Sequence, residues 1–290
     1  MSLTEFTVAG PNEGPYGVTV VDGAVWTTLV HAGVVARLSR PADRAPGDRF
    51  DLDASGSRPS VIVPGPDGAV WFTRNGDDHI GKIDAEGNIS GFAAAGAPYG
   101  LCVGPDGALW CTLMNADQLA RITVDGDVTT YPIGTSGGFP AMITATDDLW
   151  FTLNQGNAIG RMTTSGEVTT YPLPTAAAGP VGISAGPDAV WFVEILADRA
   201  GRIATDGTIE EFPLPEGSKP HAVVATDDGG CWITLWGTHS LAQLDANGNL
   251  ITQVPLGDGS EPHGLAVDAD GSVWTALESG SLAHFQRTPV

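Results

Sequence analysis

The sequence is short of cysteine and of long apolar runs, and each shortage excludes a class of protein. Only three of the 290 residues are cysteine (Cys102, Cys111 and Cys231), and each lies in an apolar stretch. So few thiols, odd in number, do not make a disulfide framework, and we expect a cytoplasmic protein with free cysteines. No apolar run approaches the roughly 20 residues of a membrane helix. The first residues also lack the basic segment and apolar core of a signal peptide.

Basic residues are scarce as well. The chain has 13 Lys and Arg against 34 Asp and Glu, a formal net charge of −21. Such a chain repels nucleic acid and anionic membranes, so we expect neither as a partner. Much of the acid lies in Asp-Gly turns such as Asp67-Gly68 and needs no functional explanation. An acidic field nevertheless favours a cation that approaches a central site.

Tryptophan marks a repeat that runs along the chain. Seven copies of a recurring phrase carry a Trp at the same place, with spacings of 45, 39, 40, 41, 41 and 42 residues. That period is typical of a propeller blade of four strands. The sequence therefore predicts an all-β protein, a seven-bladed β-propeller that occupies residues 1–290 as a single domain. The repeated residues are Trp26, Trp71, Trp110, Trp150, Trp191, Trp232 and Trp274.

The two ends of the chain complete one blade. The last copy ends near residue 285 without a fourth strand, whereas residues 4–8 have the fourth-strand pattern with no strands before them. We therefore predict that the N-terminal strand pairs with residues 282–285 and closes the ring, which leaves only short, protected sheet edges. The long first spacing indicates a surface insertion at residues 40–49.

The segment 258–278 holds the strongest candidate site. Its Asp/Gly turn at 268–271 lies between two apolar runs and predicts a hairpin that brings Glu278 opposite Glu261. His263 follows Glu261 by two residues, so strand alternation places both on one face. Facing carboxylates repel unless a cation lies between them. We predict a metal and proton-transfer site, and two carboxylates without a thiolate favour Mg²⁺ over Zn²⁺.

The residue after the first proline of each repeat should line one mouth of the central channel. Tyr16, Tyr99, His221 and His263 occupy this position, and Trp236 ends a Trp strand at the same mouth. The aromatic members suit a bulky, partly aromatic ligand, although Tyr16, Tyr99 and Trp236 could also serve packing alone. We interpret Glu194 as a surface carboxylate. Four histidines fall outside the expected site: His31, His79, His239 and His284.

The chain resembles the virginiamycin B lyase family over essentially its whole length. The resemblance rests on the seven Trp-centred repeats and on three segments: Lys219-Pro220-His221, Glu261-Pro262-His263-Gly264 and Trp274-Thr275-Ala276-Leu277-Glu278. It implies that His221 contacts substrate, that Glu261 and Glu278 hold Mg²⁺, and that His263 accepts a proton. The variable positions of the mouth, Ser60, Ala141 and Val181, leave the fit of the substrate open.

The same resemblance implies the reaction. The substrate class is a cyclic streptogramin B depsipeptide closed by an ester to a threonine side chain. Removal of the threonine α-proton expels the ester carboxylate from the β-carbon and linearises the antibiotic, which confers resistance. A cation near the neighbouring carbonyl stabilises the enolate, and a neutral imidazole accepts the proton at pH 7. We expect a monomer.

Two other functions stay open at this point. A metal-dependent lactone hydrolase on a propeller would cleave the same ester with a metal-bound water. The other is a non-catalytic binding module, a common function of propellers. Such a module should keep its function when the cluster of histidine and glutamate is lost.

Overall fold

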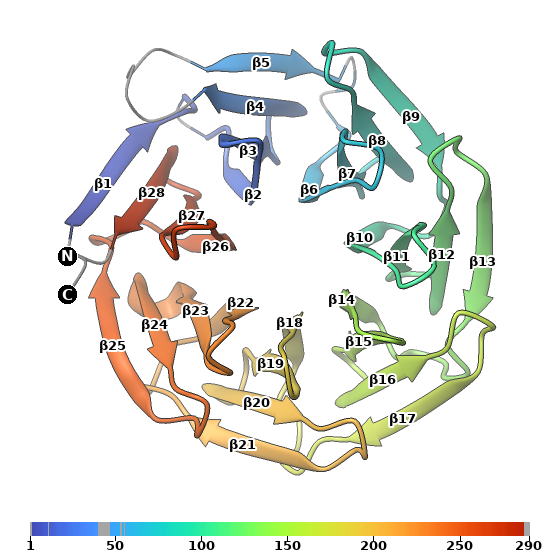
Figure 1. Ribbon diagram of the computed structural model, residues 1–290, viewed down its shortest axis with the longest axis vertical. Helices are drawn as coiled ribbons and strands as arrows, with labels where there is room; N and C mark the ends of the chain where they lie inside the picture. Colours follow the sequence, from blue (N-terminus) through green and yellow to red (C-terminus); the bar gives the residue numbers. More distant parts are fainter. Residues whose placement is uncertain (1, 11, 40–46, 53, 55, 287–290) are drawn as a thin grey trace.

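The computed structural model describes residues 2–10, 12–39, 47–52, 54 and 56–286, and they form a seven-bladed β-propeller. Seven four-stranded sheets stand around a central channel, and all their strand pairs are antiparallel (Figure 1). The helical part of the described chain is one three-residue 3₁₀ turn, η1 (Trp236–Thr238). The sequence-based prediction of an all-β propeller with seven blades is confirmed.

Each blade runs outward from the channel. The first strands, nearest the centre in Figure 1, are β2 (Pro15–Val21), β6 (Pro59–Pro64), β10 (Pro98–Val103), β14 (Pro140–Ala145), β18 (Pro180–Ala185), β22 (Pro220–Ala225) and β26 (Pro262–Val267). The second strands, which carry the repeated Trp, are β3 (Ala24–Leu29), β7 (Val70–Arg74), β11 (Leu109–Leu113), β15 (Leu149–Leu153), β19 (Val190–Glu194), β23 (Cys231–Leu235) and β27 (Val273–Leu277).

The outer half of each blade completes the sheet. The third strands are β4 (Val34–Ser39), β8 (His79–Ile83), β12 (Gln118–Ile122), β16 (Ala158–Met162), β20 (Arg199–Ile203), β24 (Ser240–Leu244) and β28 (Ser281–Gln286). The fourth strands are β5 (Asp48–Asp51), β9 (Ile89–Ala93), β13 (Val128–Pro132), β17 (Val168–Pro172), β21 (Ile209–Pro213), β25 (Leu250–Pro255) and β1 (Ser2–Thr7).

The N-terminal strand closes the ring. β1 pairs with β28, with Thr4 opposite His284 and Phe6 opposite Leu282, so the seventh blade takes its outer strand from the start of the chain. The first and last strands of the described chain, β1 and β28, consequently lie side by side in Figure 1. This pairing confirms the predicted closure.

The expected insertion at residues 40–49 is only partly described. Residues 40–46 lie outside the described residues, and Asp48 and Arg49 already belong to β5, the fourth strand of the first blade. That strand pairs with β4 through Asp48 opposite Arg37 and Arg49 opposite Ala36. The insertion was therefore predicted too long at its C-terminal end.

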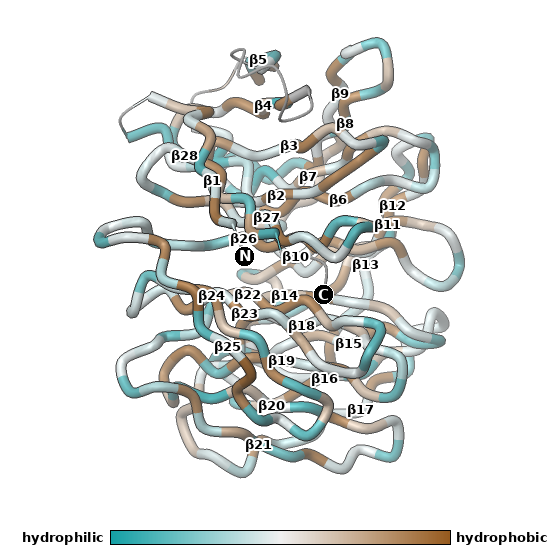
Figure 2. The backbone as a smooth tube through the Cα atoms, turned by 60° about the vertical axis from the view of Figure 1, so that its left-hand side comes forward, coloured by the Kyte–Doolittle hydropathy of each residue, from teal (hydrophilic) through white to brown (hydrophobic). Residues whose placement is uncertain are grey.

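The repeated tryptophans form the core between blades. Trp71, fully buried, packs with Leu109 and Cys111 of the next blade. Its ring stacks on Phe92 of its own outer strand with centroids 5.4 Å apart, and its Nε1 donates a hydrogen bond to Asp67 Oδ1 at 2.9 Å. Figure 2 shows the resulting pattern, with apolar stretches along the strands and hydrophilic residues in many of the turns.

The start of each first strand is bent in the same way in all seven blades. The residue before the proline has a left-handed φ between 44° and 65°, which is rare for residues other than glycine. Just after the proline the register with the second strand shifts, as between Pro262 and Leu265. A bulge of this kind turns a side chain out of the strand's regular alternation. At three of the residues that follow the proline, Tyr16, Tyr99 and His221, the side chain lines the central cavity.

Candidate active site

Glu278 lies at the centre of a chain of contacts at one mouth of the channel. It directly follows β27, and its backbone N–H donates to the carbonyl of Glu261 at 3.2 Å, so the hairpin brings the two residues together as expected. Its Oε2 lies 2.6 Å from His263 Nε2, and its Oε1 lies 2.9 Å from His31 Nε2. One carboxylate is thus held by two imidazoles from different blades.

These contacts favour the ionised form of the Glu278 carboxyl group. The hydrogen bond from His263, helped by the one from His31, lowers the pKa of Glu278 to about 2, although partial burial acts in the opposite direction. Glu278 is therefore ionised at neutral pH. An ionised carboxylate can accept hydrogen bonds on both oxygens and still has lone pairs free for a cation.

His263 is packed from two sides. Its ring stacks on Tyr16 with centroids 4.5 Å apart and meets His221 edge-on at 4.8 Å. Its backbone carbonyl accepts a hydrogen bond from Thr234 Oγ1 of the sixth blade at 3.0 Å. The side chain is only 10% exposed, and Nδ1 is buried with no hydrogen-bond partner in the described structure. Packing and the Glu278 contact leave this imidazole little freedom to turn.

His221 shares its ring environment with two tyrosines. The hydroxyl groups of Tyr16 and Tyr99 form a hydrogen bond, and the Tyr16 hydroxyl lies 3.3 Å from His221 Nε2. Burial, together with the nearby His263, lowers the pKa of His221 to about 3, so its imidazole is neutral at pH 7. Burial raises the pKa of both tyrosines. The structure therefore brings three predicted substrate-binding residues into one neutral, hydrogen-bonded cluster.

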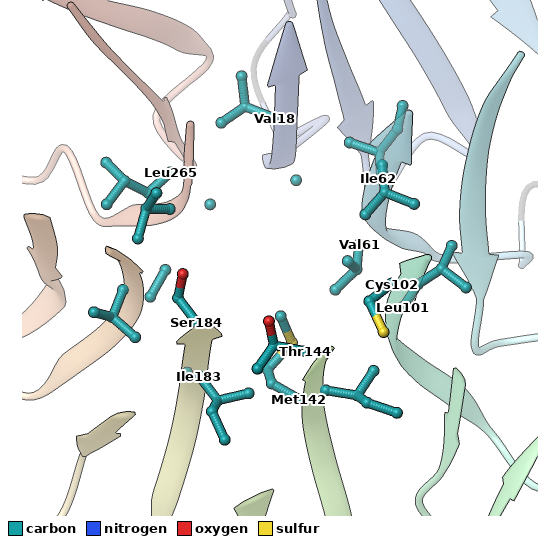
Figure 3. A pocket seen from close by; sticks show the side chains of 18 of the residues that line it. Val18, Val61, Ile62, Leu101, Cys102, Met142, Thr144, Ile183, Ser184 and Leu265 are labelled. Atoms are coloured by element: carbon teal, nitrogen blue, oxygen red, sulfur yellow. The ribbon is translucent and has the colours of Figure 1, made fainter. Parts of the chain in front are cut away.

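Below this cluster lies the central channel. A cavity of about 270 Å³ extends between the first strands, and Tyr16, Tyr99 and His221 belong to its wall. Figure 3 shows further side chains that line it, among them Met142 and Cys102, with hydroxyl oxygens on Thr144 and Ser184. The cavity is too small for a cyclic hexadepsipeptide, so a ligand of that class would have to rest on the mouth above it.

Glu261 faces a second, outer pocket. This pocket has a volume of about 560 Å³ and is lined by Asn12, His31, Gly259, Glu261, Glu278 and Ser279. Strand alternation does not govern Glu261, because its φ of 49° and the shifted register after Pro262 interrupt the strand. Glu278 consequently lies between two neighbours: His263 on the side of the channel cluster and Glu261 in the outer pocket.

The outer pocket fits a hard divalent cation through its oxygen atoms. Glu261 and Glu278 supply two carboxylates, and Mg²⁺ commonly binds one or two carboxylates and keeps several waters. Within the described residues, no three His, Cys, Asp or Glu side chains are close enough to enclose an ion by themselves. A cation here would therefore depend on Glu261 and Glu278 and on water or substrate for its remaining ligands.

Trp236 is placed differently from the other predicted substrate-binding residues. Within the described part of the chain it lines neither the channel cavity nor the outer pocket. Its ring lies beneath the Lys219 ammonium group at 5.2 Å, and its Nε1 is buried without a hydrogen-bond partner. Trp236 thus belongs to the rim of the sixth blade, one strand away from His221.

Two expectations about single residues are wrong. Glu194, expected at the surface, is fully buried, and burial beside the Glu211 carboxylate raises its pKa to about 8. His31, expected outside the site, contacts Glu278 directly. His239 also comes near, because its Nδ1 accepts a 3.4 Å hydrogen bond from the backbone of Glu261. The sequence held no signal for either histidine, since both lie in turns after second strands.

The fold and the site define a class: a seven-bladed propeller with a histidine–carboxylate cluster at one mouth of its channel. Residues 1–285 match the profile of the Virginiamycin B lyase family, and the chain belongs to that family. None of the helices in the described structure is long or apolar enough to cross a membrane.

Solved structures of this family are similar over nearly the whole chain. The selenomethionine-substituted virginiamycin B lyase of Staphylococcus aureus is 36% identical, with a TM-score of 0.94 and 99% of each chain covered. A catalytically inactive histidine-to-alanine variant of the same enzyme, solved with quinupristin, is 36% identical with a TM-score of 0.93 over 99% of each chain.

Curated relatives match over shorter stretches. The virginiamycin B lyase of Nocardia farcinica is 44% identical over 90 residues, which are 31% of this chain and 30% of that protein. The one of Streptomyces coelicolor is 49% identical over 94 residues, 32% of this chain and 29% of that protein. The aligned stretches thus span less than a third of these relatives.

Proposed function

We propose that the protein linearises cyclic streptogramin B depsipeptides by eliminative cleavage of the threonyl ester, an activity that would confer resistance. One observation carries the proposal: Glu278 joins the imidazole of His263 to the pocket that Glu261 lines. A base beside a pair of cation-binding carboxylates suits removal of a weakly acidic proton next to a carbonyl. Membership of the family and the inactive histidine variant of a relative with bound quinupristin support the same reaction.

In this proposal His263 takes the α-proton of the threonine residue. Its Nδ1 is covered, so Nε2 is the atom that a substrate can reach. Nε2–H donates a hydrogen bond to the ionised Glu278 in the contact described above, so Nε2 can act as a base only after the carboxylate turns toward the outer pocket and the Nε2 proton passes to water, which leaves the ring's remaining proton on Nδ1. As the threonine α-proton then moves to Nε2, the Cβ–O bond breaks, its electrons leave with the ester carboxylate, and Cα and Cβ become doubly bonded. His263 then passes the proton to water.

The other residues hold the substrate and the charge. Glu261 and Glu278 would bind Mg²⁺, which when bound polarises the carbonyl beside the α-carbon and stabilises the developing enolate. His221, neutral at pH 7, and Tyr16 and Tyr99 present polar atoms and aromatic faces to a depsipeptide on the mouth. Trp236 would add an aromatic face at the rim. No protein nucleophile takes part in this reaction.

Mass spectrometry tests the reaction. The purified protein is incubated with a streptogramin B compound and MgCl₂ in ¹⁸O-labelled water. We expect a linear product of unchanged mass that contains a dehydrobutyrine. His263→Ala should lower kcat by about 10²–10⁴-fold and keep the wild-type circular dichroism spectrum. A product heavier by one water with ¹⁸O incorporated would identify a lactone hydrolase instead, and an intact antibiotic would favour a binding module.

The cation is tested at its two carboxylates. Glu261→Gln and Glu278→Gln each remove a charge from the outer pocket while keeping the side-chain shape. We expect both variants to need more MgCl₂ for half-maximal activity, and a chelator to abolish the wild-type activity reversibly. Full activity and an unchanged Mg²⁺ response in both variants would contradict the assignment. Glu167→Gln, a change at an exposed carboxylate of the fourth blade, is the control.

The proposal extends to the state of the protein in the cell. We infer a cytoplasmic protein, because Cys102, Cys111 and Cys231 are all free thiols, and we propose that it is a monomer. Size-exclusion chromatography with light scattering would measure the mass against the 29.9 kDa of one chain.

A further inference from the structure

His31 joins the first blade to the candidate site of the seventh. It lies in the turn between β3 and β4, and 247 residues separate it in sequence from Glu278, whose Oε1 its Nε2 approaches at 2.9 Å. Histidine and carboxylate pairs at an exposed surface are common and contribute little. This pair differs because the same carboxylate is bonded through its other oxygen to His263.

Backbone hydrogen bonds and the space beside Gly14 position this imidazole. The backbone N–H of His31 donates to the carbonyl of Glu13 at 3.1 Å, and that of Val30 donates to the carbonyl of Gly14 at 2.9 Å. The ring then lies against Gly14, where a β-carbon would come within 2.6 Å of His31 Cδ2. Gly14 has a φ of 65° and leaves the space that the ring fills. The backbone at Gly14 therefore bounds one side of the ring, and the bond to Glu278 holds its Nε2.

His31 and His263 hold Glu278 from opposite sides. His31 lines the outer pocket with Glu261, whereas His263 packs on Tyr16 in the channel cluster. Hydrogen bonds from neighbouring side chains fix the orientation of metal-binding carboxylates and commonly affect metal affinity about 10–100-fold. If the carboxylate turns from His263, the bond from His31 remains as its anchor in the outer pocket.

We propose that His31 is a positioning residue that holds the Glu278 carboxylate in the outer pocket in an orientation that binds a divalent cation. The inference rests on the proposed function, because it assumes that Glu261 and Glu278 bind the cation. It adds a residue of the first blade to the two carboxylates of the seventh, and so makes cation binding depend on the closed ring.

Isothermal titration calorimetry of the substrate-free protein with MgCl₂ alone tests this inference. His31→Ala should weaken Mg²⁺ binding about 10–100-fold. His31→Gln, whose amide Nε2 can still donate to Glu278 Oε1, should restore most of the affinity. The control is His79→Ala, which removes a similarly exposed histidine that lies 3.7 Å from the Asp77 carboxylate in the second blade. It should leave the affinity unchanged.

The outcomes separate this inference from the proposed function. If Glu278→Gln abolishes Mg²⁺ binding while His31→Ala has wild-type affinity, the role of His31 is overturned and the cation site stands. Tighter binding by His31→Ala would also overturn it, because the imidazole would then compete with the cation. A wild-type protein that binds no Mg²⁺ overturns the cation site and this inference together. Weaker binding by His31→Ala with recovery in His31→Gln supports it.

Discussion

At the scale of single residues, Glu194 is the clearest departure from ordinary surface chemistry. It ends β19 fully buried, and neither carboxylate oxygen has a hydrogen-bond partner in the described structure. Burial and the charge of Glu211 raise its pKa to about 8, against an ordinary value of 4.5, and Arg199 offsets this only in part. Glu211 itself accepts hydrogen bonds from the backbone N–H and the hydroxyl of Thr175. Glu194 is thus protonated at neutral pH.

This raised pKa makes stability fall with rising pH. Between pH 4.5 and about 8 the folded protein keeps a proton on Glu194 that the unfolded chain has lost, so the free energy of unfolding decreases over this range. We expect Glu194→Gln, which has no proton to lose, to melt at a higher temperature than wild type at pH 8–9. The difference in melting temperature should shrink toward zero near pH 5.

The difference in melting temperature between Glu194→Gln and wild type at each pH isolates the contribution of Glu194, since the other groups titrate in both proteins. His221, with its pKa lowered to about 3, gives the opposite slope below its ordinary value of 6.5 in both. Glu167→Gln, at an exposed carboxylate, should show no pH-dependent difference. A Glu194→Gln variant that is equally or less stable than wild type at every pH would contradict the assignment.

The residues of the site differ in how far sequence could predict them. Glu261, His263 and Glu278 belong to one hairpin, so its turn predicts their proximity, but the expected placement of Glu261 and His263 on one face is wrong, because the strand is interrupted at Glu261. Nothing local predicts His31, because its contact arises only when the ring closes and the first blade meets the seventh. Glu194 could not be predicted either, since burial of a carboxylate at the end of a strand depends on how the neighbouring blades pack.

At the scale of elements, threonine hydroxyls of the second strands connect neighbouring blades. Thr234 Oγ1 of β23 accepts from the backbone N–H of Ala222 at 2.8 Å in its own blade and donates to the carbonyl of His263 in the next. Thr152 of β15 makes the equivalent bonds to Met142 at 3.0 Å and Val181 at 2.8 Å. The repeat thus uses one hydroxyl to fix the bulged start of the following first strand.

Replacing Thr234 should therefore affect stability and activity at once. Thr234→Val keeps the shape but leaves a buried N–H and a buried carbonyl unpaired, at a cost of about 1–3 kcal/mol each. We expect kcat to fall about 10–100-fold as well, because the backbone of His263, the proposed base, loses its anchor. Denaturant unfolding and steady-state kinetics measure the two effects.

Thr152→Val is the matched control. It breaks the same pair of bonds between the fourth and fifth blades, where the residues at the mouth are Ala141 and Val181. Its loss of stability should be similar, with kcat near that of wild type. Equal losses of kcat in both variants would show that the threonine acts on the ring as a whole and would contradict a specific link to His263.

The sequence predicted where the strands lie better than it predicted their backbone conformation and register. The repeated Trp and the turn residues between apolar runs place the four strands of a blade, because both recur with the period of the blade. The left-handed residue before each proline and the register shift after it were not predicted. They are backbone features that a pattern of side chains does not reveal, yet they direct His221 and His263 to the mouth.

At the scale of the whole molecule, ring closure and the site depend on the same contacts. β1 completes the seventh blade, and Phe6 packs on Trp274 with ring centroids 5.5 Å apart. On the inner side, closure sets β2 beside β26, so that Tyr16 stacks on His263 and His31 reaches Glu278. Loosening the outer strand should therefore disturb a site that lies at the other end of the blade.

Truncation of the N-terminus tests this dependence, and two substitutions in β1 refine it. Deleting the first eight residues exposes β28 as a sheet edge, which should lower the melting temperature and promote aggregation. Phe6→Ala should cost roughly 3 kcal/mol, or about 6–12 °C in melting temperature at 2–4 °C per kcal/mol. Leu3→Ala changes an exposed side chain of the same strand and should be nearly neutral. Scanning calorimetry and the rate of antibiotic cleavage would be measured on all three.

If the truncated protein melts with the wild-type curve, the N-terminal strand does not close the ring. If it melts early but cleaves at the wild-type rate, the site does not depend on the closure.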